Sequence, residues 1–164
     1  MENRVYLDWN ATTPLRREAR EAMAAAWDLG GNPSSVHAEG RRARGLVEDA
    51  RAAVAAAVRG EPRNVIFTSG GTEANALAIR SAVDAGSRRL IVSAVEHDSV
   101  LETARASGAA VEILPVSSDG VADLAWLRPR LAAWDAVDGR PFVALMLANN
   151  ETGVIQPVAE AAEI

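Results

Sequence analysis

Three short polar segments of the sequence carry residue types that could bind a charged ligand and move protons. They lie at residues 69–73, 96–98 and 149–153. Each follows a run of apolar, often β-branched residues of the kind that forms a buried strand. Because ligands of open parallel sheets bind at the carboxyl ends of the strands, we expect these segments to meet at one edge of a sheet.

The first segment, Ser-Gly-Gly-Thr-Glu at 69–73, joins an expected strand to an expected helix. Glycines let the backbone turn tightly, and the first N–H groups of the helix, with the Thr72 hydroxyl, can hold a phosphate. The segment lacks the Gly-Lys-Ser/Thr ending of a Walker motif and the spacing of a dinucleotide fingerprint. The glycines could also serve the turn alone, so both interpretations stay open.

The other two segments offer an imidazole and two amides. His97 follows one expected strand and starts a helix, where a neutral ring can stack on a ligand or exchange protons, or simply cap the helix. Asn149 and Asn150 can donate to a ligand oxygen or satisfy the backbone of their own loop. His37 is the only other histidine. Two histidines so far apart do not form a metal motif, and we expect no metal site.

Short apolar runs alternate with Ala-rich stretches along the rest of the chain. The patterns predict helices at 14–29, 35–59, 72–83, 98–106 and 123–134, and strands at 65–68, 90–93, 111–114 and 142–147. Strands separated by helices of this length form right-handed crossovers in a mainly parallel sheet. We therefore expect an α/β fold with three α-β-α layers, preceded by an N-terminal helical segment.

We expect three regions along the chain: an extended segment at 1–14, helices at 15–60 and the sheet domain at 61–164. A last helical stretch at 157–164 has only two turns. Helices are usually longer, so we expect the sequence to be truncated at its C-terminus.

The composition limits the chemistry that this chain can perform. The 164 residues include 17 basic and 22 acidic side chains, a net charge of −5, and no cysteine. This acidic balance argues against nucleic-acid binding, and no apolar run approaches the roughly 20 residues of a membrane span. The N-terminus lacks the apolar stretch of a signal peptide, so a cytoplasmic location is expected. Every basic residue is arginine, so the chain can form neither a lysine Schiff base nor a cysteine thiolate.

Five segments together resemble the N-terminal part of the cysteine desulfurases, which are fold type I pyridoxal-phosphate enzymes of the class V aminotransferase superfamily. The resemblance covers the chain from Tyr6 onwards. The segments are Tyr-Leu-Asp-Trp-Asn-Ala-Thr-Thr-Pro at 6–14, Gly-Asn-Pro-Ser-Ser-Val-His at 31–37, Val-Ile-Phe-Thr-Ser-Gly-Gly-Thr-Glu-Ala-Asn at 65–75, Glu-His at 96–97 and Asn-Asn-Glu-Thr-Gly at 149–153. The resemblance implies that the sheet domain is part of a pyridoxal-phosphate transferase large domain.

The resemblance also implies a role for individual residues toward the cofactor, pyridoxal 5′-phosphate. Gly71 and Thr72 match positions that hold the phosphate. His97 matches the histidine that stacks on the pyridine ring and moves protons, which makes it the expected catalytic residue. Asn150 matches the asparagine that hydrogen-bonds the phenolic oxygen.

On the substrate side, the resemblance implies that Asn10, Thr12, Asn32 and Ser34 line the cleft. The implied reaction converts L-cysteine into L-alanine and leaves the sulfur as an enzyme-bound persulfide. An acceptor protein then takes the sulfur for iron–sulfur cluster assembly or thiolation, and the enzymes of this family are homodimers.

Other essential residues of the family match no position in this chain. They are the cofactor lysine, the aspartate at the pyridine nitrogen, further phosphate ligands, the sulfur-accepting cysteine and the arginine for the substrate carboxylate. We therefore expect the 164-residue chain to be inactive alone. The alternatives are a related class V enzyme, such as a selenocysteine lyase, an aminotransferase or an enzyme for cysteine sulfinate, serine or kynurenine-type substrates, and a non-catalytic truncated module that pairs with a partner chain.

Overall fold

The computed structural model of the protein describes residues 4–164. The chain divides into two compact units, one ending at Phe67 and the other spanning Thr68–Ile164.

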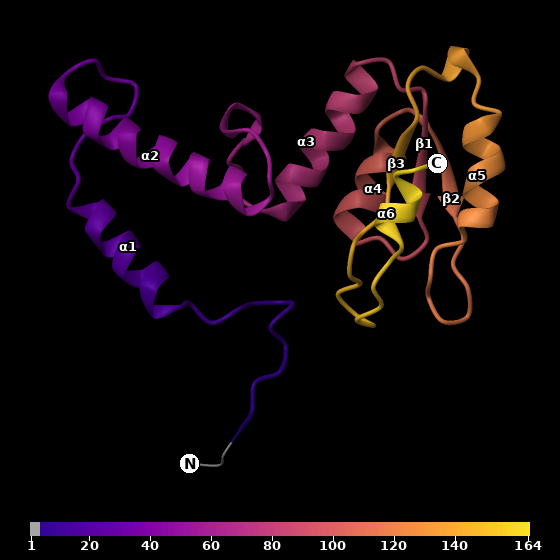
Figure 1. Cartoon of the computed structure of the whole chain (residues 1–164), viewed down its shortest axis with the longest axis horizontal. Helices are drawn as coiled ribbons and strands as arrows, with labels where there is room; N and C mark the ends of the chain where they lie inside the picture. Colours follow the sequence, from indigo (N-terminus) through magenta and orange to yellow (C-terminus); the bar gives the residue numbers. More distant parts are fainter. Residues whose placement is uncertain (1–3) are drawn as a thin grey trace. The chain divides into compact units, whose positions relative to one another are not determined.

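The first unit contains the helices α1 (Arg17–Trp27) and α2 (Ala38–Ala57) and the short 3₁₀ helix η1 (Pro62–Asn64) (Figure 1). The loop before α2 packs tightly on the first turn of this helix. A Cβ atom added to Gly40 would lie 2.4 Å from the carbonyl oxygen of Ser35 and 2.7 Å from that of Asn32. Only glycine permits this approach, so Gly40 fixes the course of the loop at 32–35.

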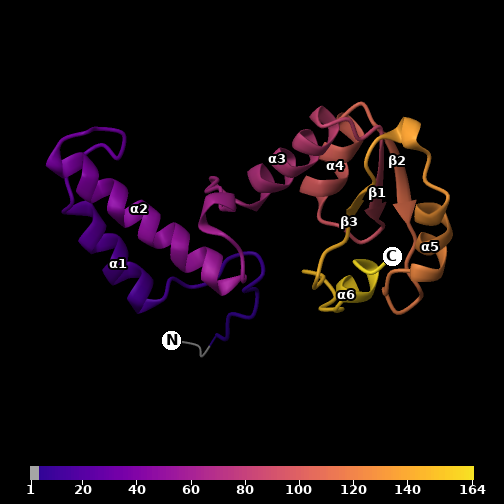
Figure 2. The ribbon, with the colours of Figure 1, turned by 45° about the horizontal axis from the view of Figure 1, so that its top comes forward.

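The second unit is built on a parallel sheet. Its strands are β1 (Arg89–Ser93), β2 (Ala110–Leu114) and β3 (Phe142–Ala144), in the order β2-β1-β3. Its helices are α3 (Gly71–Asp84), α4 (Asp98–Ala106), α5 (Leu124–Ala132), the short η2 (Ala136–Asp138) and α6 (Val158–Ala161). In Figure 2, α3 and α4 lie on one side of the strands and α5 on the other.

The pleat of β1 explains these layers, because successive side chains of a strand point to opposite faces. On one face, Leu90 and Val92 join a buried cluster completed by Ile79, Val100 and Ala104 from α3 and α4. On the other face, Ile91 joins a cluster completed by Leu114, Ala122 and Leu127. The central strand is therefore covered on both sides, and the predicted three-layer α/β fold is confirmed.

The strand predicted at 65–68 is wrong. Residues Val65–Phe67 end the first unit and belong to no strand of the described chain. The Arg51 guanidinium of α2 donates to the carbonyl oxygen of Val65 and lies 5.2 Å from the centre of the Phe67 ring. The β-branched sequence still favours an extended backbone, but the Val65 carbonyl oxygen pairs with a helix side chain instead of a neighbouring strand.

The strand predicted at 142–147 is shorter, because β3 ends at Ala144. The next backbone N–H groups leave the ladder. That of Met146 donates to the Glu96 carboxylate, which follows β1. The Glu96 side chain thus accepts a backbone hydrogen bond at the point where β3 leaves the sheet. Because Glu96 lies at the carboxyl end of the strands, it is part of the candidate site.

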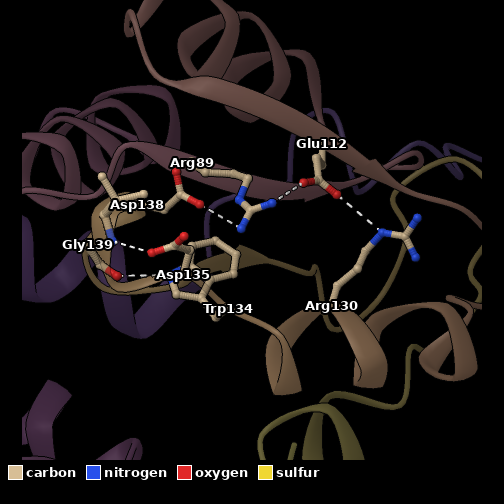
Figure 3. A network of polar contacts seen from close by, with 8 residues as sticks. Arg89, Glu112, Arg130, Trp134, Asp135, Asp138 and Gly139 are labelled. Carbon is tan, nitrogen blue, oxygen red and sulfur yellow. Dashed lines mark hydrogen bonds and ion pairs between the residues drawn. The ribbon is translucent and has the colours of Figure 1, made fainter.

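A network of charged side chains ties the start of β1 to the loop that precedes β3 (Figure 3). The Arg89 guanidinium lies 2.9 Å from Glu112 of β2, 2.7 Å from Asp138 of η2 and 4.4 Å from the centre of the Trp134 ring. Glu112 also pairs with Arg130 of α5 at 3.3 Å. Arg89, Glu112 and Asp138 are about three-quarters buried, so their attraction is less screened than that of a surface pair.

Arg89→Met is expected to lower the free energy of unfolding by about 2 kcal/mol, because it leaves the partly buried carboxylate of Asp138 without its cation and leaves Glu112 with Arg130 alone. The methionine keeps an apolar stem against Trp134, so lost packing contributes little. Urea unfolding measures the effect. Arg105→Met is the control, because Arg105 pairs with Glu102 at the surface and its loss should change stability by about 0.5 kcal/mol or less. Equal effects of the two changes would contradict the proposed stabilising role of the network.

Candidate functional site

The candidate site lies where β1 and β3 end, as the sequence predicts. The chain after β1 and the chain after β3 are joined there by two hydrogen bonds. Glu96 accepts from the backbone of Met146, and the Nδ2 atom of Asn149 donates to the carbonyl oxygen of Val95 at 2.9 Å. The segments at 96–98 and 149–153 therefore form one continuous rim at the carboxyl edge of the sheet.

Asn149 organises the turn that carries Asn150. The Asn149 side chain is buried. Its Oδ1 atom accepts from the backbone N–H groups of Glu151 and Thr152, at 2.9 and 2.8 Å, and from the Thr152 hydroxyl at 3.0 Å. This amide serves its own loop, which is one of the two interpretations that the sequence leaves open for the asparagine pair.

Asn150 is placed differently from its neighbour. It is half-buried at the rim, and its Nδ2 atom donates to the exposed carboxylate of Glu151 at 2.8 Å. A ligand oxygen can replace such an exposed acceptor at small cost, because water competes for the same hydrogen bond in any case. Of the two asparagines, Asn150 is thus the better candidate donor to a ligand.

His97 is the N-cap residue of α4. Its Nδ1 atom accepts from the backbone N–H of Ser99 at 3.0 Å and lies 2.8 Å from the Ser99 hydroxyl. The same hydroxyl accepts from Nδ2 of Asn75 at 2.8 Å. Asn75 stands on the second turn of α3, so this contact holds the start of α4 against the start of α3. Capping uses Nδ1 and leaves Nε2 on the opposite side of the ring.

Gly71 and Thr72 begin α3, and the N-cap position before them is Gly70. Cβ atoms added at Gly70 or Gly71 would meet nothing within 4 Å, so the space before the helix is open. The Glu73 carboxylate accepts from both the N–H and the hydroxyl of Ser69 at 2.6 Å, and these hydrogen bonds hold the pKa of Glu73 below its usual value. The amides of Gly71 and Thr72, which have no acceptor within the helix, are then the donors best placed for an anion.

Two pockets open at this edge. The pocket of about 460 Å³ is lined by Val95–Asp98 and Asn149–Thr152, so it brings His97 and Asn150 together. A second pocket of about 320 Å³ is lined by Asn75, Glu96, His97 and apolar side chains from α3, α4 and β3. Gly71 and Thr72 line neither pocket. Asn75, one turn further along α3, lines the second pocket together with His97 and connects this helix to the start of α4 through its hydrogen bond to Ser99.

The residues expected on the substrate side lie in the first unit. The Thr12 hydroxyl donates to the carbonyl oxygen of Ala11 at 2.8 Å, and Asn10 lies in the same exposed turn. The Oδ1 atom of Asn32 accepts from the backbone of Ser34 at 2.9 Å. These are local loop contacts, and the role of all four residues toward a substrate stays a prediction.

Glu96 is a residue of this site to which the sequence analysis gave no role. Burial raises the pKa of its carboxyl group, while the Met146 N–H and the neighbouring His97 partly offset that rise. The one sequence signal was its place directly between a strand and His97. Its partner, Met146, lies 50 residues away, so no local pattern could reveal the contact.

Glu96→Gln is expected to remove a decline of stability with rising pH. Where the folded carboxyl is still protonated and the unfolded one is not, the folded state binds more protons, so the free energy of unfolding falls as pH rises. This window opens at the usual glutamate pKa and closes at the raised pKa of Glu96. Urea midpoints of the wild type, relative to those of the variant, should fall across this window. A constant difference would contradict the role of burial.

Within residues 4–164, no group of three or more His, Cys, Asp or Glu side chains is arranged to hold a metal ion. In the same part of the chain, no helix has the length and apolarity needed to cross a bilayer.

Comparison with known proteins places this arrangement in a family. The family model for class-V aminotransferases matches residues 5–164, which is nearly the whole chain. The chain belongs to the class-V aminotransferase family. The resemblance seen in the sequence is thereby confirmed at the level of this family.

Several curated relatives of this chain are named either cysteine desulfurase or selenocysteine lyase. It is 40% identical to the cysteine desulfurase IscS of Dictyoglomus turgidum, over 100% of this chain and 42% of that protein. It is 39% identical to the selenocysteine lyase of Xenopus laevis, over 99% of this chain and 42% of that protein. The chain therefore spans about two-fifths of the length of these relatives.

Solved structures agree with the fold of the class-V chain. A NifS-like protein from Rickettsia africae superimposes with a TM-score of 0.86 at 33% identity, covering 97% of this chain and 44% of that one. DndA from Streptomyces lividans gives a TM-score of 0.74 at 36% identity, covering 97% and 45%. The fold is that of the NifS-like transferases, of which this chain matches less than half.

Proposed function

We propose that this chain is the N-terminal part of a pyridoxal-phosphate-dependent cysteine desulfurase, which converts L-cysteine into L-alanine and an enzyme-bound persulfide. The observation that carries the proposal is the pocket at the carboxyl edge of the sheet. It combines the imidazole of His97 and the amide of Asn150 in a chain of the class-V aminotransferase family.

The residues present suit the cofactor. The phosphate of pyridoxal phosphate is an anion, and the start of α3 offers the Gly71 and Thr72 amides in front of open space. The positive end of the helix dipole adds to this attraction. The pocket of about 460 Å³ is of the size that holds a small organic ligand. When bound, the cofactor supplies an electron sink for the substrate's carbon atoms.

The chain's own residues contribute binding and proton transfer. His97 offers a flat ring that can stack on the cofactor and a nitrogen, Nε2, that can accept or release a proton. Asn150 donates an amide hydrogen to an oxygen of the bound group. Asn149 and Glu96 hold these two side chains in place by joining their loops. The loops that carry Asn10, Thr12, Asn32 and Ser34 would line the substrate side.

The 164-residue chain by itself is expected to be inactive, because it contains neither lysine nor cysteine. Covalent attachment of the cofactor needs an amine, and persulfide formation needs a thiol. The test is sulfide release from L-cysteine with added pyridoxal phosphate. A rate no higher than that of the free cofactor is expected, and a clearly higher rate would contradict this assignment of roles.

A selenocysteine lyase is the second candidate, and one observation favours it. The relatives of that name from Xenopus laevis and Homo sapiens are 39% and 38% identical to this chain, close to the 40% of the cysteine desulfurase from Dictyoglomus turgidum. An aminotransferase of the same family, or a truncated module that pairs with a partner chain, remains a further alternative.

The deciding experiment starts from the native gene product. Its intact mass should be far above the 17.3 kDa of this chain, as the two-fifths coverage of the relatives suggests. The purified product should then form alanine and a protein persulfide from L-cysteine. Alanine from selenocysteine alone would favour the lyase, and a native mass of 17.3 kDa without cofactor uptake would favour the module.

We further propose a cytoplasmic homodimer that passes sulfur to an acceptor protein for iron–sulfur cluster assembly or thiolation.

A further inference from the structure

The three residues Asn75, Ser99 and His97 form a hydrogen-bonded chain across the starts of α3 and α4. Asn75 and Ser99 are half-buried, and His97 is exposed at the pocket. Nδ2 of Asn75 lies 2.8 Å from the Ser99 hydroxyl oxygen, which in turn lies 2.8 Å from Nδ1 of His97.

The direction of these bonds follows from the donors that each group carries. An amide nitrogen can only donate, so the Ser99 oxygen accepts from Asn75, and the hydroxyl hydrogen remains free to donate to His97. The backbone N–H of Ser99 also donates to Nδ1 of His97, at 3.0 Å. The backbone N–H can donate to Nδ1 only while this nitrogen carries no proton, and the Ser99 hydroxyl is then a second donor within reach of the same lone pair.

We infer that Asn75 and Ser99 are positioning residues that hold His97 as the tautomer protonated on Nε2. This inference rests on the proposed function, in which His97 moves a proton, and it names the atom involved. Nδ1 is committed to the start of the helix. Nε2 is then the nitrogen that offers its hydrogen to a ligand in the pocket, and net transfer of that proton from the ring requires Nδ1 to take up another proton in its place.

The other histidine provides an internal reference with the opposite arrangement. Nδ1 of His37 lies 2.9 Å from a carboxylate oxygen of Glu39, which can only accept, and 3.3 Å from the backbone nitrogen of Gly40. The shorter contact, to a charged acceptor, favours a proton on Nδ1. The two histidines of the chain should therefore differ in tautomer when both rings are neutral.

Nitrogen-15 NMR of the histidine rings tests this inference in the 164-residue chain, in alkaline buffer and without cofactor or substrate. The wild type should show Nδ1 of His97 as the unprotonated nitrogen. Asn75→Asp should shift the tautomer ratio toward Nδ1–H by about tenfold, because a carboxylate takes the Ser99 hydrogen and turns the hydroxyl oxygen into an acceptor for His97. Asn64→Asp, the same change at an exposed residue of η1, should leave the ratio unchanged.

The serine variants keep the test valid if Asn75→Asp does not fold. Ser99→Ala removes one of the two donors and should shift the ratio by about fivefold, whereas Ser99→Thr keeps the hydroxyl and should behave as the wild type. The inference would be overturned if both Asn75→Asp and Ser99→Ala had the tautomer ratio of the wild type. If Asn75→Asp does not fold, a wild-type ratio in Ser99→Ala would overturn it as well. Because no cofactor is present, a failure of the proposed function would leave these results unaffected.

Discussion

If the complete protein is the proposed desulfurase, His97→Ala is expected to lower its turnover by about 10²–10⁴-fold, the usual contribution of a general acid or base. The expectation follows from the position of His97 on the pocket that also contains Asn150. It also follows from the hydrogen bond between Nδ1 and the first turn of α4, because this bond leaves Nε2 as the nitrogen available for proton transfer. Steady-state alanine formation from L-cysteine measures the loss, which should fall mainly on kcat.

A second substitution separates chemistry from helix capping. Asparagine is a strong N-cap residue but moves no proton at neutral pH, so His97→Asn should keep the stability of α4 while losing turnover as His97→Ala does. His37→Ala replaces the histidine at the N-cap position of α2 in the first unit and should leave turnover within a few-fold of the wild type. Near-normal turnover of His97→Asn would show that His97 acts only as a cap.

The central layers of the fold could be predicted because they depend on local patterns. The helix predicted at 98–106 has the observed bounds of α4, since His97 can cap its start and Gly108, with a φ of 83°, follows its end. The strands β1 and β2 were found because they contain short runs rich in β-branched and apolar residues, which Glu112 interrupts only once in β2. The segment at 65–68 has a similar run, but a strand also needs a partner. Local sequence contains no information on whether one lies alongside.

The place of the candidate site was predictable to the same extent. The sequence predicts that His97 and Asn150 share one edge because each follows a strand of a parallel sheet, and they line one pocket there. The long-range hydrogen bonds that hold them were not predictable, because these bonds join distant parts of the chain. Asn149 reaches Val95 across 54 residues, and Asn75 reaches Ser99 across 24. Only the packing of α3 on α4 and of β3 beside β1 brings these partners together.

Gly139→Ala is expected to destabilise the second unit by about 2–5 kcal/mol, the combined cost of a left-handed backbone and of overpacking. Gly139 follows η2 with a φ of 72° and a ψ of −150°, a conformation that is nearly confined to glycine. A Cβ atom there would lie 2.0 Å from the carbonyl oxygen of Gly86, which is backbone and cannot move as a flexible side chain would. Urea unfolding of the variant measures the loss.

The effect should be large because several contacts depend on this close approach. The Gly139 carbonyl oxygen accepts from Nε1 of Trp134 at 2.9 Å, and that of Asp138 accepts from the backbone of Arg88 at 2.8 Å, just before β1. Gly108→Ala is the matched control, since Gly108 also has a positive φ, of 83°, but open space around its Cα. It should lose only about 1–2 kcal/mol from the backbone conformation. Equal losses in the two variants would mean that the η2 loop yields to the added methyl group, and that the contact with Gly86 contributes little to the position of β1.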